Sequence, residues 1–66
     1  MKFYVVEMVD GIVEQLIDCE DSVEGISFAY NTFARLANEN GANINLDTLD
    51  EEFWRNDKYS VQLVRA

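Results

Sequence analysis

The chain contains no histidine and only one cysteine in 66 residues. A single cysteine cannot form an internal disulfide, so no covalent crosslink is expected to stabilise this short chain. Without histidine, and with one cysteine, the chain can form neither a zinc site that uses histidine nor one built from cysteines alone. One unpaired cysteine is typical of a reducing compartment, so we expect a cytoplasmic protein in which Cys19 packs as a small hydrophobic side chain.

Motifs for catalysis and for membrane insertion are also missing. There is no glycine-rich phosphate-binding loop, and no histidine to activate a serine or cysteine nucleophile. No apolar run approaches 18 residues, and no basic-then-apolar leader is seen, so neither a membrane span nor a signal peptide is expected. We therefore predict a single domain over residues 1–66 that is not an enzyme and that has no cofactor and no metal site.

Positive charge is scarce. Five basic residues stand against thirteen acidic ones, which gives a net charge of −8. Such a charge repels nucleic acid and anionic membranes, and it attracts cationic surfaces. A charge of about this size also serves solubility alone. The composition thus favours a protein partner with a basic surface, and it predicts no direct contact with nucleic acid or membrane.

One amphipathic helix is predicted over residues 22–40. Its apolar positions recur at the helical spacing of three and four residues and comprise Val23, Ile26, Ala29, Tyr30, Phe33, Leu36 and Ala37. Either Asp21, with Glu24 completing a capping box, or Ser22 starts the helix, and Gly41 ends it. Gly25 flanks the apolar side and predicts a close approach to a strand, whereas Phe28 points away from that side.

Strands are predicted on both sides of this helix. Residues 2–8 and 12–19 flank Asp10-Gly11, a pair typical of a two-residue hairpin turn. Residues 58–65 alternate between apolar and polar side chains, which indicates one more strand. For residues 47–57 we favour a loop or helical turn, and the alternative is a strand at 52–55 that turns at Asn56-Asp57. The predicted fold class is α+β: a small antiparallel sheet, built from an N-terminal hairpin and a C-terminal strand or hairpin, with one helix on one face, in the order ββαβ(β).

The turn predicts which side chains share a face of the hairpin. It places Glu7 opposite Glu14 and Val5 opposite Leu16. We assign to the helix the face with Tyr4, Val6, Met8, Val13, Gln15 and Ile17. The other, open face then carries Phe3, Val5, Glu7, Val9, Ile12, Glu14, Leu16 and Asp18. Like charges directly opposite destabilise a ladder, so either the register differs by one, or both carboxylates point into water, or this face meets lysine or arginine of a partner.

In size and charge balance the chain resembles small acidic phage-encoded proteins that inhibit host defence or nucleic-acid enzymes, anti-CRISPR proteins among them. The MKFYVVE start, the single helix ending in NENG and the closing YSVQLV strand contribute to this resemblance. It implies stoichiometric inhibition, without a cofactor, of a host protein through its basic nucleic-acid-binding surface. The expected partner-binding residues are Phe3, Val5, Glu7, Glu14, Leu16 and Asp18 on the open face, and Asp47, Asp50, Glu51 and Glu52 beside them.

A second hypothesis belongs to a different class of function. The apolar side chains of the open face could instead stack on a second copy of the chain, which would make a homodimeric structural or accessory protein. Self-association would add buried surface to a chain whose own core is small. The opposed Glu7 and Glu14 argue mildly against this, because a two-fold stack could gather four carboxylates.

Overall fold

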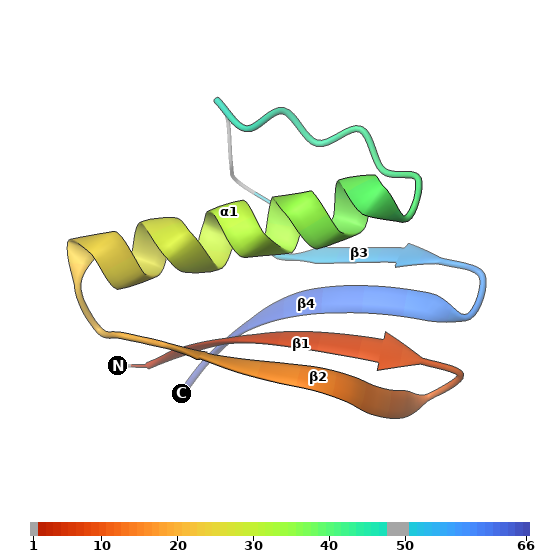
Figure 1. The fold of residues 1–66 in the computed structure, drawn as a ribbon, viewed down its shortest axis with the longest axis horizontal. Helices are drawn as coiled ribbons and strands as arrows, with labels where there is room; N and C mark the ends of the chain where they lie inside the picture. The colour runs from red at the N-terminus through yellow and green to blue at the C-terminus, as the bar shows by residue number, and fades with distance from the viewer. Residues whose placement is uncertain (1, 48–50) are drawn as a thin grey trace.

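A computed structural model describes residues 2–47 and 51–66. The elements are β1 (Phe3–Val9), β2 (Ile12–Cys19), α1 (Val23–Glu39), β3 (Phe53–Asn56) and β4 (Tyr59–Arg65). The four strands form one antiparallel sheet in the order β2-β1-β4-β3. Figure 1 shows α1 lying along one side of this sheet, with the two chain ends close together. The predicted α+β class is confirmed.

Both hairpins use residues in the left-handed region at their turns. Asp10 and Gly11 have φ of 55° and 78°, as the two-residue turn requires, and Val9 pairs with Ile12. Asp57 has φ of 53° between β3 and β4. Residues 53–56 therefore form a strand, and our preference for a loop or helical turn there is wrong. The hydrogen bonds offered by the outer edge of β4 select the extended form.

The helix begins and ends as the sequence indicates. Ser22 is the N-cap, since its hydroxyl accepts a hydrogen bond from the Gly25 amide at 3.0 Å. Gly41 follows the helix with φ of 112°. A Cβ atom at Gly25 would lie 2.0 Å from the backbone oxygen of Glu20, directly after β2. The predicted close approach at Gly25 is thus real and involves backbone.

The core lies between α1 and the central strands. Its fully buried side chains are Phe33 from the helix, Val5 from β1, Val61 from β4 and Cys19 at the end of β2. Trp54 and Tyr59 close one side, with ring centroids 6.2 Å apart. Most of the predicted helix positions face this core, but Val23 is 82% exposed because it stands at the first turn.

A β-bulge in β2 changes which side chains of the first hairpin share a face. Beyond Met8 and Val13 the register shifts, so Glu7 pairs with Gln15 and Glu14 becomes the extra residue. Past the bulge, Val5 pairs with Ile17 rather than Leu16. Residues that pair directly share a face, and one inserted residue exchanges the faces of everything beyond it. The helix therefore covers Phe3, Val5 and Glu7, and the pairing of Glu7 with Glu14 is wrong.

After the helix the chain is held by amide side chains. The Asn38 side chain accepts from the Ile44 amide at 2.8 Å and donates to the Ile44 carbonyl at 3.1 Å. These two bonds fix the buried Ile44 under the helix end. Leu46, two residues later, is by contrast 55% exposed.

Candidate functional site

The face of the sheet opposite α1, here called the open face, is apolar and has no described segment over it (Figure 1). Register and burial place two groups of side chains on it. The apolar group is Tyr4, Val6, Met8, Val13, Leu16, Phe53 and Val64. The polar group is Lys2, Asp18, Arg55, Ser60 and Gln62. The open face is thus real, but its composition differs from the predicted one.

Two of the predicted partner-binding residues lie in the core. Phe3 is 6% exposed and Val5 is not exposed at all, so neither can contact a partner in the folded chain. The cause is that α1 covers the face of β1 that carries Phe3 and Val5, which is opposite to the face assigned to the helix from the sequence. Leu16 and Asp18 remain on the open face, because the prediction placed this part of β2 correctly. Glu14 is exposed on the outer strand at the bulge itself.

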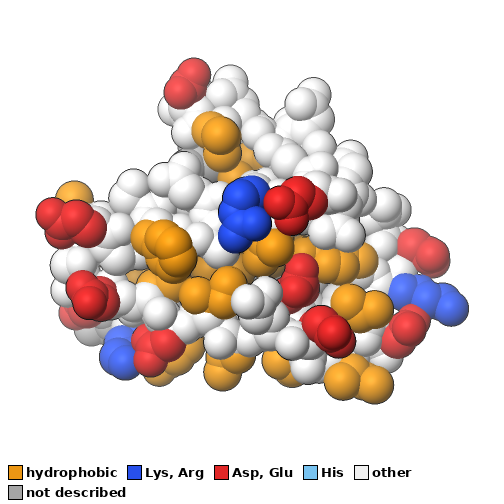
Figure 2. Space-filling model, viewed as in Figure 1, with side chains coloured by type: hydrophobic (Ala, Val, Ile, Leu, Met, Phe, Trp, Pro, Cys, Tyr) orange, Lys and Arg blue, Asp and Glu red, His pale blue; other side chains and the backbone are white. Residues whose placement is uncertain are grey.

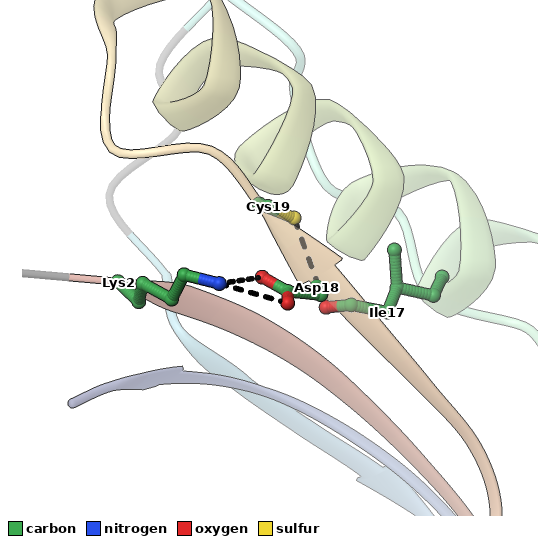
Figure 3. Close-up of polar contacts among 4 residues, drawn as sticks. All are labelled: Lys2, Ile17, Asp18 and Cys19. Atoms are coloured by element: carbon green, nitrogen blue, oxygen red, sulfur yellow. Dashed lines mark hydrogen bonds and ion pairs between the residues drawn. The ribbon is translucent and has the colours of Figure 1, made fainter.

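Asp18 is neutralised by a neighbour on the same face. Lys2 Nζ lies 2.9 and 3.2 Å from the two carboxylate oxygens. Figure 3 shows Lys2 reaching from the start of β1 to Asp18, while the adjacent Cys19 points toward α1. The hydrogen bond to Asp18, and then its charge, raise the pKa of Lys2 above its usual value. The carboxylate on the strands of the open face is therefore compensated, while Asp10 and Asp57 border this face at the hairpin turns.

Glu7 faces the helix side and is engaged within the chain. Its Oε2 accepts a hydrogen bond of 2.7 Å from the Tyr59 hydroxyl. Burial, and then this hydrogen bond, raise the pKa of Tyr59 above its ordinary value of 10.0. Glu7 thus holds β4 to β1 and is not presented to a partner.

This contact predicts a loss of stability at high pH. A tyrosine whose pKa is higher in the folded state stabilises the fold below about pH 10, and this contribution disappears as the pH rises further. We expect the free energy of unfolding to fall more steeply between pH 9.5 and 11.5 in the wild type than in Tyr59→Phe, which should itself be about 1 kcal/mol less stable at pH 8. Urea titrations at each pH measure both. Tyr4→Phe, on the open face, is the control, and equal slopes for wild type and Tyr59→Phe would contradict the assignment.

The acidic residues of the connector have different roles. Asp47 and Glu51 are exposed, as expected for a contact surface. Glu52 is partly buried, accepts a hydrogen bond of 2.8 Å from the Tyr30 hydroxyl and pairs with Arg65. Glu52 therefore ties the connector to α1 and β4. Asp50 lies outside the described residues.

A second group of carboxylates surrounds an exposed phenylalanine. Glu20, Glu24 and Asp18 line a shallow pocket at the start of α1, together with Phe28. Phe28 is 53% exposed and also borders a groove along the outer side of α1. That groove is lined by Asn31, Thr32, Arg35, Asn38, Glu39 and Leu46 as well. The position of Phe28 outside the core was expected, but this proximity was not.

Most of the basic residues are compensated by acidic ones. Ion pairs join Lys2 to Asp18, Arg35 to Glu39, Lys58 to Asp10 and Arg65 to Glu52. The Lys and Arg side chains in view in Figure 2 each lie beside an acidic side chain. Arg55 has no ion pair within the described part of the chain. The remaining surface is thus dominated by negative charge.

Other chemistry finds little support in the described ranges. Cys19 is buried, and burial followed by the charge of Asp18 raises the pKa of its thiol. Within residues 2–47 and 51–66, no three carboxylate or thiol side chains gather closely enough to hold a metal ion. In the same ranges no helix has the length and hydropathy needed to cross a membrane. Comparison of the chain with protein-family models, curated proteins and solved structures gave no match.

Proposed function

We propose that this chain is a non-enzymatic binding protein that engages a protein with a basic surface through the acidic pocket around Phe28. The target class that fits this chemistry is a nucleic-acid-binding host protein, whose lysine and arginine side chains would otherwise contact phosphates. Binding would then inhibit the target stoichiometrically and would need no cofactor, in the manner of the phage-encoded inhibitors that the sequence resembles.

One observation carries the proposal: an exposed aromatic side chain stands among carboxylates. Phe28 is 53% exposed, and Glu20 and Glu24 line the same pocket. Neither glutamate forms an ion pair with any described residue. An aromatic anchor provides contact area, and surrounding charge gives partner choice and fast association. Glu24 in the first helical turn also favours the helix, so only part of its role is recognition.

The experiment is capture of partners from the native host, compared between charge-matched variants. The first bait is Glu20→Gln with Glu24→Gln, which removes two charges beside Phe28. The control bait is Glu14→Gln with Glu51→Gln, which removes two exposed charges elsewhere. We expect the first bait to lose at least about tenfold in affinity for the captured protein, and the control to lose less than about threefold.

Two further measurements decide the outcome. Moderate salt should release the captured protein, because exposed charges are screened beyond about 10 Å at 0.1 M and beyond about 3 Å at 1 M. The purified target should lose its nucleic-acid binding at one equivalent of this chain. Equal capture by both baits, or a target that binds nucleic acid as well as before, would overturn the proposal.

A further inference from the structure

We propose that the open face is the interface of a two-fold homodimer. Its apolar side chains come from all four strands, and Val13, Leu16 and Phe53 on the outer strands are each more than half exposed. An uncovered sheet face of this composition is unusual for a solvated surface. The inference concerns the face of the sheet opposite α1, which shares Asp18 with the acidic pocket, and it does not depend on the function proposed above.

The charge of the open face fits a second copy better than it fits a basic partner. The strands of the face carry Lys2 and Arg55 against Asp18, and the hairpin turns that border it add Lys58 against Asp10 and Asp57, so three basic residues balance three acidic ones, while the whole chain carries −8. Two acidic molecules repel least where they meet through surfaces whose own charges are balanced. A basic protein, in contrast, would prefer the carboxylates at the edges and at the helix start. The open face is thus the part of the described surface through which a second acidic copy can bind with the least electrostatic repulsion.

The area approaches that of a specific contact. The strands contain 7, 8, 4 and 7 residues, and at about 3.3 Å per residue and about 4.8 Å between strands they give a face of roughly 400 Å². Two such faces amount to about 800 Å² as flat areas, and the relief of the side chains adds to this, compared with the roughly 1,000 Å² that a specific interface needs. A domain of 66 residues has a small core of its own and gains from such burial.

The polar residues of the face are self-complementary. In the strand register Asp18 lies opposite Tyr4, at one end of the sheet. Arg55 lies opposite Ser60, which in turn lies opposite Met8, at the other end. Asp18 and Arg55 therefore occupy diagonally opposite corners, about 14 Å apart across the strands and about 13 Å along them. A two-fold axis along the other diagonal brings each Arg55 onto the Asp18 of the second copy, which would then be shared between Arg55 and Lys2 of its own chain. Arg55, the base without an ion pair in the described chain, thereby gains one.

The same operation matches the apolar side chains. It turns the strands of the two copies to nearly 90°, which is one of the two preferred angles of sheet packing. Phe53 then lies over Tyr4 and Val64 of the second copy, and Leu16 lies over Met8 of the second copy. These contacts follow from strand order and register alone.

Pairing of the sheet edges is a less favourable way to dimerise. The outer strand β2 is interrupted by the bulge at Glu14, and the other outer strand, β3, has only four residues. Bulges and short edge strands both hinder the addition of another strand. Face-to-face contact is therefore the arrangement that this sheet favours.

The test is sedimentation equilibrium of the full chain with two matched variants. Leu16→Glu places a charge on the open face, whereas Ile12→Glu makes the same change at a site 67% exposed on the other side of the sheet. The wild type should sediment near 15 kDa, twice the chain mass of 7.6 kDa. We expect Leu16→Glu to raise the dissociation constant at least about a hundredfold, and Ile12→Glu to change it less than about threefold.

A charge exchange tests the geometry. Arg55→Asp alone should weaken the dimer about tenfold, and adding Asp18→Arg should restore it. Salt should strengthen the dimer, because it screens repulsion between two acidic copies, whereas salt releases a basic partner. The two proposals can therefore fail separately. A wild type that stays at 7.6 kDa up to 0.2 mM, or equal dissociation constants for Leu16→Glu and Ile12→Glu, would overturn the homodimer.

Discussion

Replacing Phe33 with alanine is expected to lower the free energy of unfolding by about 3–5 kcal/mol. Phe33 is fully buried and is among the largest completely enclosed side chains between α1 and the sheet. Its removal leaves a cavity that the surrounding strands cannot close. A 66-residue domain has roughly 3–10 kcal/mol of stability in all, so the variant should be largely unfolded at 37 °C. Urea titration followed by Trp54 fluorescence and far-UV circular dichroism measures the change.

The matched control is the same substitution five residues earlier on the same helix. Phe28→Ala removes an identical group from a side chain that is 53% exposed, so stability should change by less than about 0.5 kcal/mol. Both variants must be compared at one protein concentration, since a dimer makes stability depend on it. If the two substitutions cost the same, the assignment of the helix faces is wrong.

Replacing Gly25 with alanine is expected to destabilise the chain by about 2 kcal/mol. Helix propensity alone predicts the opposite sign, a gain of about 1 kcal/mol. The added Cβ, however, would lie 2.0 Å from the Glu20 backbone oxygen and 2.7 Å from its carbonyl carbon. Backbone cannot rotate away as a side chain can, so the connection between β2 and α1 must move. Thermal and urea unfolding both report the result.

Position 11 is the comparison for position 25, because it requires glycine for its backbone angle and not for lack of space. No atom lies within 4 Å of a Cβ at Gly11, but its φ is 78°. Gly11→Ala should cost about 1 kcal/mol, and Gly11→Asn should recover most of this, because asparagine tolerates the left-handed region. Gly25→Asn should recover nothing. A stabilising Gly25→Ala would show that the helix start moves freely away from β2.

Features encoded by neighbouring residues were predicted well from the sequence. The Asp10-Gly11 turn, the helix with Gly41 after it, the buried Cys19 and the exposed Phe28 are all confirmed. Each depends on a backbone angle, a periodicity or a cap that acts within a few residues. The crowding at Gly25 was also predicted, because a glycine beside an apolar helix face has a cost that close packing explains.

The register of the first hairpin could not be predicted in the same way. The turn correctly paired Val9 with Ile12 and Met8 with Val13, but the bulge then exchanged the faces of β2 relative to β1, and α1 covers the face of β1 opposite to the predicted one. Phe3 and Val5 moved from a candidate contact surface into the core as a result. Either face of β1 is apolar enough to be covered by α1, so hydrophobic pattern does not discriminate between them.

The availability of the candidate contact residues could not be predicted from the sequence either. Glu7 and Glu52 looked available in the sequence, but they bind Tyr59 and Tyr30, which are distant along the chain. Glu24 was predicted only as part of a capping box, but it lies with Glu20 around an exposed Phe28. Which carboxylates remain at the surface depends on long-range contacts that composition does not contain.

The sequence by itself determined the elements, their order, the turns and the acidic character of this protein. Propensity and capping act within a few residues, and the net charge is a sum over all residues, so none of them depends on the tertiary structure. Only the tertiary structure decided which face of the sheet stays uncovered and which carboxylates are engaged. The physical reason is that a single bulge residue exchanges inside and outside for half a hairpin at little local cost.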